Sequence, residues 1–133
     1  MSDTSKEIHR LAAQGYCCAQ ILLQMGLDAR QDENPELVDA VAGLCGGLYS
    51  GLTCGTLTGA ACLLSLYDRN AAKSMIPKLV EWFQTTYGAS CGGINCDEII
   101  AGNPDNRLER CPGIMEETYE KCRELLAELG HEI

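Results

Sequence analysis

Apolar residues recur three and four positions apart along nearly the whole chain, and no stretch of alternating β-branched residues interrupts this pattern. Cys18, Ile21, Leu22 and Met25 show the spacing clearly, because they fall at positions i, i+3, i+4 and i+7 of one helical face. The pattern predicts an all-α fold. We expect a compact single domain over residues 1–133, built as a bundle of about five to six helices.

Caps, prolines and glycines predict where these helices begin and end. A cap at Asp3, Thr4 or Ser5 opens the first helix, and Gly15 ends or bends it. The other expected boundaries are a second helix closed by Gly26, a loop over 28–34, a third helix opened by Pro35, a fifth from about Ser74 with Pro77 in its first turn and Gly88 at its end, a loop over 89–96, a short helical piece over 97–101, and a last helix from Pro112 to Gly130.

The fourth predicted helix starts near Cys54 and is apolar on nearly every side, which predicts a buried central helix. It belongs to an uncharged run, residues 40–67, that is long enough to cross a bilayer. Glycines break up this run and favour a buried loop followed by a helix, so we expect no membrane span. The glycines are Gly43, Gly46, Gly47, Gly51, Gly55 and Gly59.

Charge and the N-terminus narrow the choice of partners and compartment. The formal net charge is −9, and Lys and Arg form no cluster, which argues against a nucleic-acid partner. Residues 1–7 have no basic start, apolar core or cleavage site, so we expect a cytoplasmic location. In a reducing compartment, nine cysteines indicate metal ligands or redox catalysts rather than permanent disulfides, and an odd number cannot pair completely within one chain.

Helix geometry separates some of these cysteines. Cys54 and Cys62 are eight residues apart, or about 12 Å along one helix, and Cys111 and Cys122 are about 16 Å apart on another. Neither pair can share a disulfide or a metal ion. Free cysteine is among the most buried residue types, so Cys62 and Cys122 are predicted to be core residues.

Four other cysteines share a position relative to predicted helices. Cys54, Cys96 and Cys111 each come just before a helix, and Cys18 lies in the first turns of another. A helix N-terminus carries unpaired N–H groups and partial positive charge, which favour a nucleophilic or ligating thiolate. The alternative is that all four are separate buried or capping residues.

Glycines and missing motifs add two points. Gly51, Gly55 and Gly59 recur every fourth residue beside Cys54, which fits either tight helix packing or room for a ligand or cofactor at Gly55 and Gly59. No Cys-x-x-Cys pair is present, which excludes the thioredoxin, zinc-knuckle and haem-attachment motifs. The loop from Cys91 to Cys96 could close a disulfide or chelate a metal, and the roles of Cys17, Cys45 and Cys91 stay open.

Several segments together resemble the C_GCAxxG_C_C family, which is named for a redox-active role. The segments are Gly15-Tyr16-Cys17-Cys18-Ala19-Gln20, Cys54-Gly55-Thr56-Leu57-Thr58-Gly59, Ile94-Asn95-Cys96 and Cys111. The resemblance implies four characteristic cysteines, carried over here to Cys18, Cys54, Cys96 and Cys111. Thr56 departs from the alanine that more often follows Cys-Gly in the family motif.

Three functions stay open at this point. The first is a thiol-based redox protein, an oxidoreductase if it is an enzyme, in which Cys54 attacks an oxidant or the disulfide of an unidentified redox partner and Cys18 resolves the product. The second is a binding module in which Cys18, Cys54, Cys96 and Cys111 hold zinc or an iron–sulfur cluster. The third is an interaction domain with incidental cysteines. A homodimer is compatible with all three.

Overall fold

The computed structural model describes residues 1–133, and helices are its only regular secondary structure, which confirms the predicted all-α fold. Its only β-type pairing is an isolated antiparallel bridge between Thr53 and Asn95. The principal helices are α1 (Asp3–Ala13), α2 (Cys18–Ala29), α3 (Pro35–Val41), α4 (Gly55–Tyr67), α5 (Arg69–Phe83) and α8 (Asn106–Ala127). Short elements connect them, namely η1 (Ala42–Leu44), η2 (Gly47–Gly51), η3 (Gln84–Gly88), α6 (Ala89–Cys91) and α7 (Cys96–Ile99).

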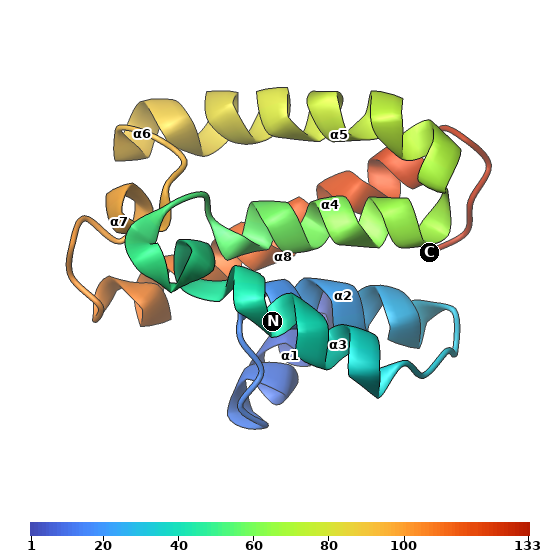
Figure 1. Ribbon diagram of the computed structural model, residues 1–133, viewed down its shortest axis with the longest axis horizontal. Coiled ribbons are helices and arrows are strands. Elements are labelled where there is room, and N and C mark those ends of the chain that lie inside the picture. The colour runs from blue at the N-terminus through green and yellow to red at the C-terminus, as the bar shows by residue number, and fades with distance from the viewer.

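Helix α4 is the centre of the bundle. It packs against α2 on one side, α5 on another and α8 on a third, as Figure 1 shows, so the predicted central helix is confirmed. Helix α1 packs against α2 and α8 and lies below α4 in Figure 1, next to α2 and α3. Because α4 touches three neighbours, its sequence must be apolar almost all round.

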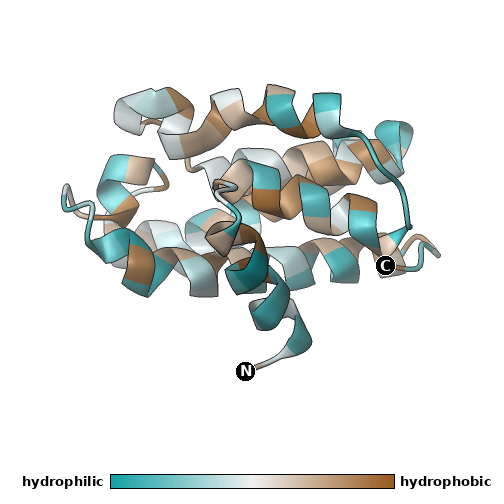
Figure 2. Cartoon of the chain, turned by 90° about the horizontal axis from the view of Figure 1, so that it is seen from below, coloured by the Kyte–Doolittle hydropathy of each residue, from teal (hydrophilic) through white to brown (hydrophobic).

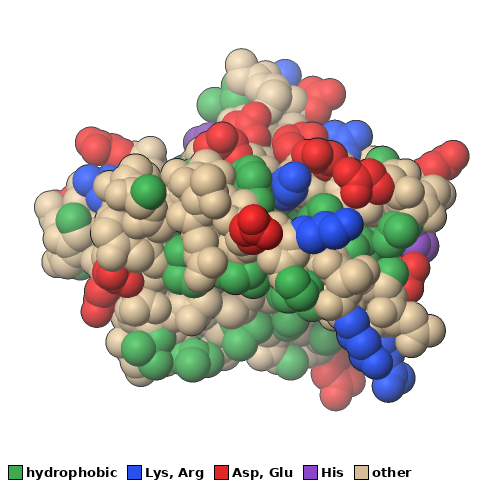
Figure 3. Space-filling model, turned by 90° about the horizontal axis from the view of Figure 1, so that it is seen from above, with side chains coloured by type: hydrophobic (Ala, Val, Ile, Leu, Met, Phe, Trp, Pro, Cys, Tyr) green, Lys and Arg blue, Asp and Glu red, His purple; other side chains and the backbone are tan.

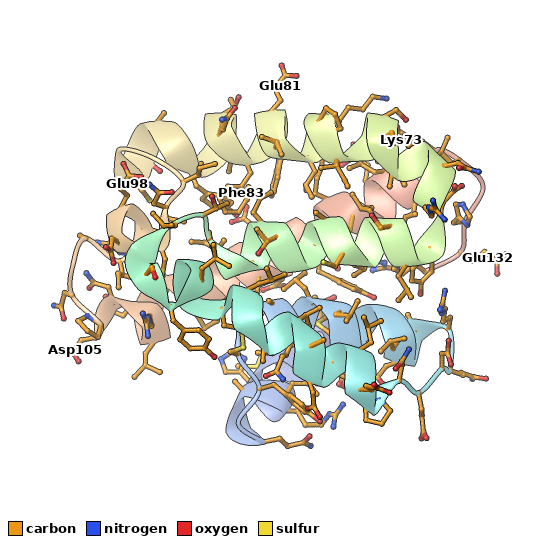
Figure 4. The ribbon with its side chains drawn as sticks, in the orientation of Figure 1. Lys73, Glu81, Phe83, Glu98, Asp105 and Glu132 are labelled. Carbon is orange, nitrogen blue, oxygen red and sulfur yellow. A yellow bond between two sulfur atoms is a disulfide. The ribbon has the colours of Figure 1, made fainter.

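Apolar side chains from all the long helices form the core. Brown and teal bands alternate along the helices in Figure 2, as expected where each helix has one apolar side. In Figure 4, Phe83 of α5 points inward, whereas Lys73 and Glu81 of the same helix point away from the bundle. Phe83 is fully buried and stacks edge-on with Tyr87, their ring centroids 4.9 Å apart. On the face shown in Figure 3, acidic and basic side chains are interspersed.

Helix α5 begins earlier than the sequence indicated, at Arg69 rather than Ser74. Asp68 caps it by accepting a hydrogen bond from the N–H of Ala71 at 3.0 Å, in the same position where it ends α4. Pro77 therefore lies inside the helix and not in its first turn, contrary to the prediction. The error arose because a single residue serves as both the stop of one helix and the cap of the next.

Three other predicted boundaries are wrong. Gly26 does not close α2 but lies buried within it, facing Leu63 of α4. Helical structure continues past Gly88 to Cys91, where Gly92 adopts a left-handed conformation with φ of 84°. Helix α8 begins at Asn106, so Pro112 is an interior residue. Close packing against α4 explains Gly26, and at the start of α8 the amide of Asn106 donates a hydrogen bond to the carbonyl of Ile100 at 2.7 Å.

The uncharged run over 40–67 is divided between the end of α3, η1, η2 and α4. Between η1 and α4 the backbone takes left-handed conformations, with φ of 62° at Leu48 and 53° at Tyr49. Both side chains are exposed. None of the helices combines the length and the hydropathy needed to span a bilayer.

Candidate functional site

A cavity of about 530 Å³ lies where α2 and α4 begin and where η2, α7 and the first turns of α8 meet them. Six of the nine cysteines line it, and they come from segments far apart in the chain: Cys17, Cys18, Cys45, Cys54, Cys96 and Cys111. All four cysteines singled out from the sequence are in this set. The remaining lining is mostly apolar, with Thr56, Asp97 and Arg107 among the polar residues.

The starts of α2 and α4 bring Cys18 close to Cys54. Cys18 is the first residue of α2, and Cys54 is the N-cap residue of α4. A Cβ atom added to Gly55, the residue after Cys54, would lie only 2.6 Å from the Cys18 Sγ. Glycine at this position therefore lets the Cys18 sulfur approach the first turn of α4.

The isolated bridge places Cys96 beside Cys54. The N–H of Cys54 donates to the carbonyl of Ile94 at 3.0 Å, and the N–H of Cys96 donates to the carbonyl of Leu52 at 2.6 Å. Residues alternate sides along an extended segment, so Cys54 and Cys96 project from the same face of the bridge as diagonal neighbours. Cys96 then opens α7.

Cys111 reaches the cavity in a different way from the one predicted. Because α8 begins at Asn106, Cys111 lies in the second turn of that helix and not before its N-terminus. The Arg107 guanidinium, one turn earlier, lies beside both Cys111 and Cys96, with its Nη2 atom 3.9 Å from the Cys96 Sγ. Of the four predicted cysteines, Cys18, Cys54 and Cys96 are at helix starts and Cys111 is not.

Burial, rather than helix position, dominates the acidity of these thiols. Burial raises the pKa of Cys54 to about 11, and the neighbouring Cys18 sulfur adds to the effect. The N–H groups of Thr56 and Leu57 and the Thr56 hydroxyl oppose it only in part. The pKa of Cys18 is also raised, chiefly by burial, and that of Cys111 rises to about 12 for the same first reason. The expectation of a low-pKa thiolate at Cys54 is therefore wrong for the reduced protein.

Cys17 and Cys45 contribute a feature that sequence reasoning missed. Their sulfur atoms lie at disulfide distance, with Cα atoms 6.1 Å apart. Cys17 is the half-buried N-cap residue of α2, and Cys45 is buried just after η1. The pairing joins residues 28 positions apart. No spacing rule indicates it, because the contact depends on how α3 folds back over α2.

The other three cysteines lie away from the cavity. Cys122 is fully buried among apolar side chains, and its Sγ is 3.9 Å from the carbonyl of Ala60, as expected of a core residue. Cys62 was also predicted to be a core residue, but it is only half-buried and packs against the edge of a smaller apolar cluster beside α3. Cys91 is half-buried at the end of α6, near the hydroxyl of Ser90. These three cysteines can therefore serve as controls in experiments on the cysteines of the cavity.

The two glycines predicted to make room for a ligand or cofactor differ in their surroundings. Gly55 lines the cavity and faces Cys18. Gly59 faces α2 instead, where an added Cβ would lie 2.6 Å from the Cα of Ala19. Close helix packing explains Gly59, whereas Gly55 serves both packing and the cavity.

Four thiols are a donor set that suits zinc or an iron–sulfur cluster. In the structure, however, no group of three or more His, Cys, Asp or Glu side chains converges closely enough to hold a metal ion. The cavity thiols as they lie therefore do not form a ligand set for such a group, and the Cys₄ metal site stays a prediction.

Comparison with known proteins identifies a family for this chain. No curated protein and no solved structure matches the chain. One family model does match, over residues 16–125, and its description is "Putative redox-active protein (C_GCAxxG_C_C)". The match covers most of the chain and includes every cysteine of the cavity. The chain therefore belongs to the C_GCAxxG_C_C family.

Proposed function

We propose that this protein is a thiol–disulfide oxidoreductase that works through Cys18 and Cys54, with Cys96 and Cys111 as a second pair of thiols in the same cavity. The observation that supports it most strongly is the gathering of six cysteines around one cavity, while Cys62, Cys91 and Cys122 lie elsewhere. Cys18 and Cys54 are the first pair because the Cys18 Sγ lies against Gly55, the residue that follows Cys54, and the Cys18 sulfur contributes to the raised pKa of Cys54.

The exposure of the two thiols suggests their order of action. Cys54 is only 7% exposed, whereas Cys18 is half-buried, so Cys18 is the thiol that meets a substrate disulfide. This reverses the roles expected from helix position alone. Cys54 is then the resolving thiol, held behind Cys18 at the start of α4.

The exchange proceeds in two steps. The Cys18 thiolate attacks one sulfur of a substrate disulfide, whose S–S bond breaks, and the other substrate sulfur leaves and takes up a proton. Cys54 loses its proton and attacks the Cys18 Sγ, which releases the second substrate sulfur as a thiol. The product is a Cys18–Cys54 disulfide. Two electrons and two protons pass to the substrate, and a dithiol reductant later restores the protein.

The raised pKa values favour a reducing pair. A buried, protonated dithiol lacks the thiolate stabilisation that makes a thiol pair oxidising, so its disulfide form is relatively favoured. We therefore expect a reduction potential closer to that of thioredoxin, about −270 mV, than to that of strongly oxidising thiol pairs. Formation of the attacking Cys18 thiolate also limits the rate, and burial raises the pKa of that thiol, so exchange should accelerate as the pH rises above neutrality.

Disulfide mapping tests the proposal directly. Wild-type protein and the variants Cys54→Ser, Cys18→Ser and Cys62→Ser are reduced, oxidised with diamide, alkylated and digested with trypsin and chymotrypsin. Cleavage after Tyr49 separates Cys45 from Cys54. We expect a Cys18–Cys54 link in the wild type and in Cys62→Ser, and none in the other two variants, which should also lose turnover of a disulfide substrate.

Two outcomes would refute the proposal. One is a wild-type protein that never forms the Cys18–Cys54 link and reduces disulfide substrates no faster in the presence of a dithiol than buffer does. The other is anaerobically purified protein that contains a stoichiometric metal lost in Cys54→Ser, since this would favour the metal-binding alternative.

A further inference from the structure

Three cysteines converge at the start of α4, on the side of the cavity formed by α2 and η1. An added Cβ on Gly55 would lie 2.6 Å from the Cys18 Sγ and 3.2 Å from the Cys45 Cα. Cys45 and the Cys18 sulfur therefore both lie against Gly55. The N–H of Gly46, the residue after Cys45, also points to the Cys18 sulfur. Cys45 thus lies between two candidate partners, Cys17 and Cys18.

We propose that Cys17 and Cys45 form a second redox pair, which exchanges disulfide bonds with Cys18 and Cys54 through Cys45. The inference rests on the thiol chemistry proposed above and adds a route by which the cavity is reduced again. Neither Cys17 nor Cys45 is among the four cysteines of the family pattern, so their part in this chemistry follows from their position alone.

The exchange needs no outside oxidant. With a disulfide at Cys18–Cys54, the Cys45 thiolate attacks the Cys18 Sγ, the bond to Cys54 breaks, and Cys54 leaves as a thiolate that takes up the proton Cys45 lost. The Cys17 thiolate then attacks the Cys45 Sγ and releases Cys18 as a thiol. The disulfide has moved to Cys17–Cys45, and the number of thiols is unchanged.

The difference in burial between these cysteines gives the transfer of the disulfide a function. Cys54 is 7% exposed and Cys45 is 2% exposed, whereas Cys17 is half-buried at the N-cap of α2. An external dithiol reductant can therefore reach the Cys17 sulfur more readily than either of the buried ones. Reduction at Cys17 leaves Cys18 and Cys54 as thiols, ready for another substrate disulfide.

The variant Cys17→Ser provides the test, because it forces Cys45 to use its other partner. Serine is a good N-cap residue, so α2 should be retained, and far-UV circular dichroism checks this. After diamide oxidation and digestion as above, we expect a Cys18–Cys45 link in Cys17→Ser. In the wild type we expect both Cys17–Cys45 and Cys18–Cys45 links, which fragmentation between residues 17 and 18 distinguishes.

Cys54→Ser separates this inference from the proposed function. In that variant the Cys17–Cys45 and Cys18–Cys45 links should both persist, although no Cys18–Cys54 bond can form. The inference is overturned if Cys45 stays freely alkylated in Cys17→Ser, or if the wild type contains only the Cys17–Cys45 link at every stage of oxidation. Either result leaves the Cys18–Cys54 reaction standing.

Discussion

The two ends of α4 are built differently. At its C-terminal end the polar groups are paired: the Tyr67 hydroxyl donates to the carbonyl of Gly26 at 2.6 Å, and Asp68 caps α5 and contacts the His131 ring nitrogen at 3.0 Å. At its N-terminal end, Cys54 makes no side-chain cap hydrogen bond and opens onto a cavity.

The two ends of α4 therefore have different roles: residues at the C-terminal end stabilise the bundle, and cysteines at the N-terminal end are available for reaction. A closed, hydrogen-bonded end contributes to the free energy of unfolding and has no reactive group. The open end places thiols around a space and surrounds them with left-handed backbone at Leu48 and Tyr49. Changes at the two ends should therefore affect different measurements.

The largest effect is expected from Gly55→Ala, compared with Gly26→Ala at the other end. In both, the new methyl group meets atoms closer than 3 Å, the Cys18 Sγ in one and the Leu63 Cγ in the other. Each should lower the free energy of unfolding by about 1–3 kcal/mol, measured by urea denaturation. Only Gly55→Ala should reduce the yield of the Cys18–Cys54 disulfide, and an equal reduction in both would argue against a special role for the N-terminal end.

Tyr67→Phe should have a smaller effect, confined to stability. It removes the hydrogen bond to the Gly26 carbonyl and should cost about 1 kcal/mol in urea denaturation. The rate of disulfide exchange should match the wild type, since Tyr67 lies at the far end of α4. A change in that rate would show that the two ends are coupled.

Thr56→Val should affect the thiols and hardly alter stability. The Thr56 hydroxyl lowers the pKa of both Cys18 and Cys54, and valine keeps the shape without the hydroxyl. Alkylation of these two thiols at neutral pH should slow by a factor of about 3–10, since a tenfold change corresponds to one pKa unit. Thr56→Ser should restore the rate. Equal alkylation rates in the wild type and both variants would show that the Thr56 hydroxyl does not affect these thiols.

Asp68→Asn should give the smallest effect, and one that depends on pH. The N–H of Ala71, and then His131, hold the pKa of Asp68 below its ordinary value of 3.8. The stability that the carboxylate contributes is present above that value and is lost as the pH falls through the lowered pKa. Melting temperatures of the variant and the wild type should therefore differ at pH 6 and converge toward pH 3. A constant difference would contradict this assignment.

The long helices, the central position of α4 and part of the sorting of the cysteines could be predicted from the sequence. The apolar spacing located every long helix, the all-round apolar pattern of α4 predicted its central position, and the arithmetic along helices separated Cys122 from Cys111. Caps were less certain, because Asp68 serves two helices and Asn106 starts α8 through a contact with Ile100. Such contacts are made between segments, and a local pattern does not contain them.

The pairing of the cysteines and the pKa values of their thiols also could not be predicted from the sequence, because both depend on the three-dimensional structure. Position at a helix start predicted a low pKa for Cys54, but the depth of burial, which the local sequence does not specify, reverses the direction. Cys17 and Cys45 come together only because α3 and η1 return to the start of α2.

Differential alkylation across a series of thiol–disulfide buffers is the most direct test of the central claim that the thiols beside α4 act as a redox pair. All nine cysteines are labelled before and after reduction and quantified by mass spectrometry. Cys18 and Cys54 should become oxidised together, at one midpoint potential, while Cys62 and Cys122 stay reduced throughout. If Cys18 and Cys54 stay reduced at every potential, or titrate independently of each other, the claim is wrong.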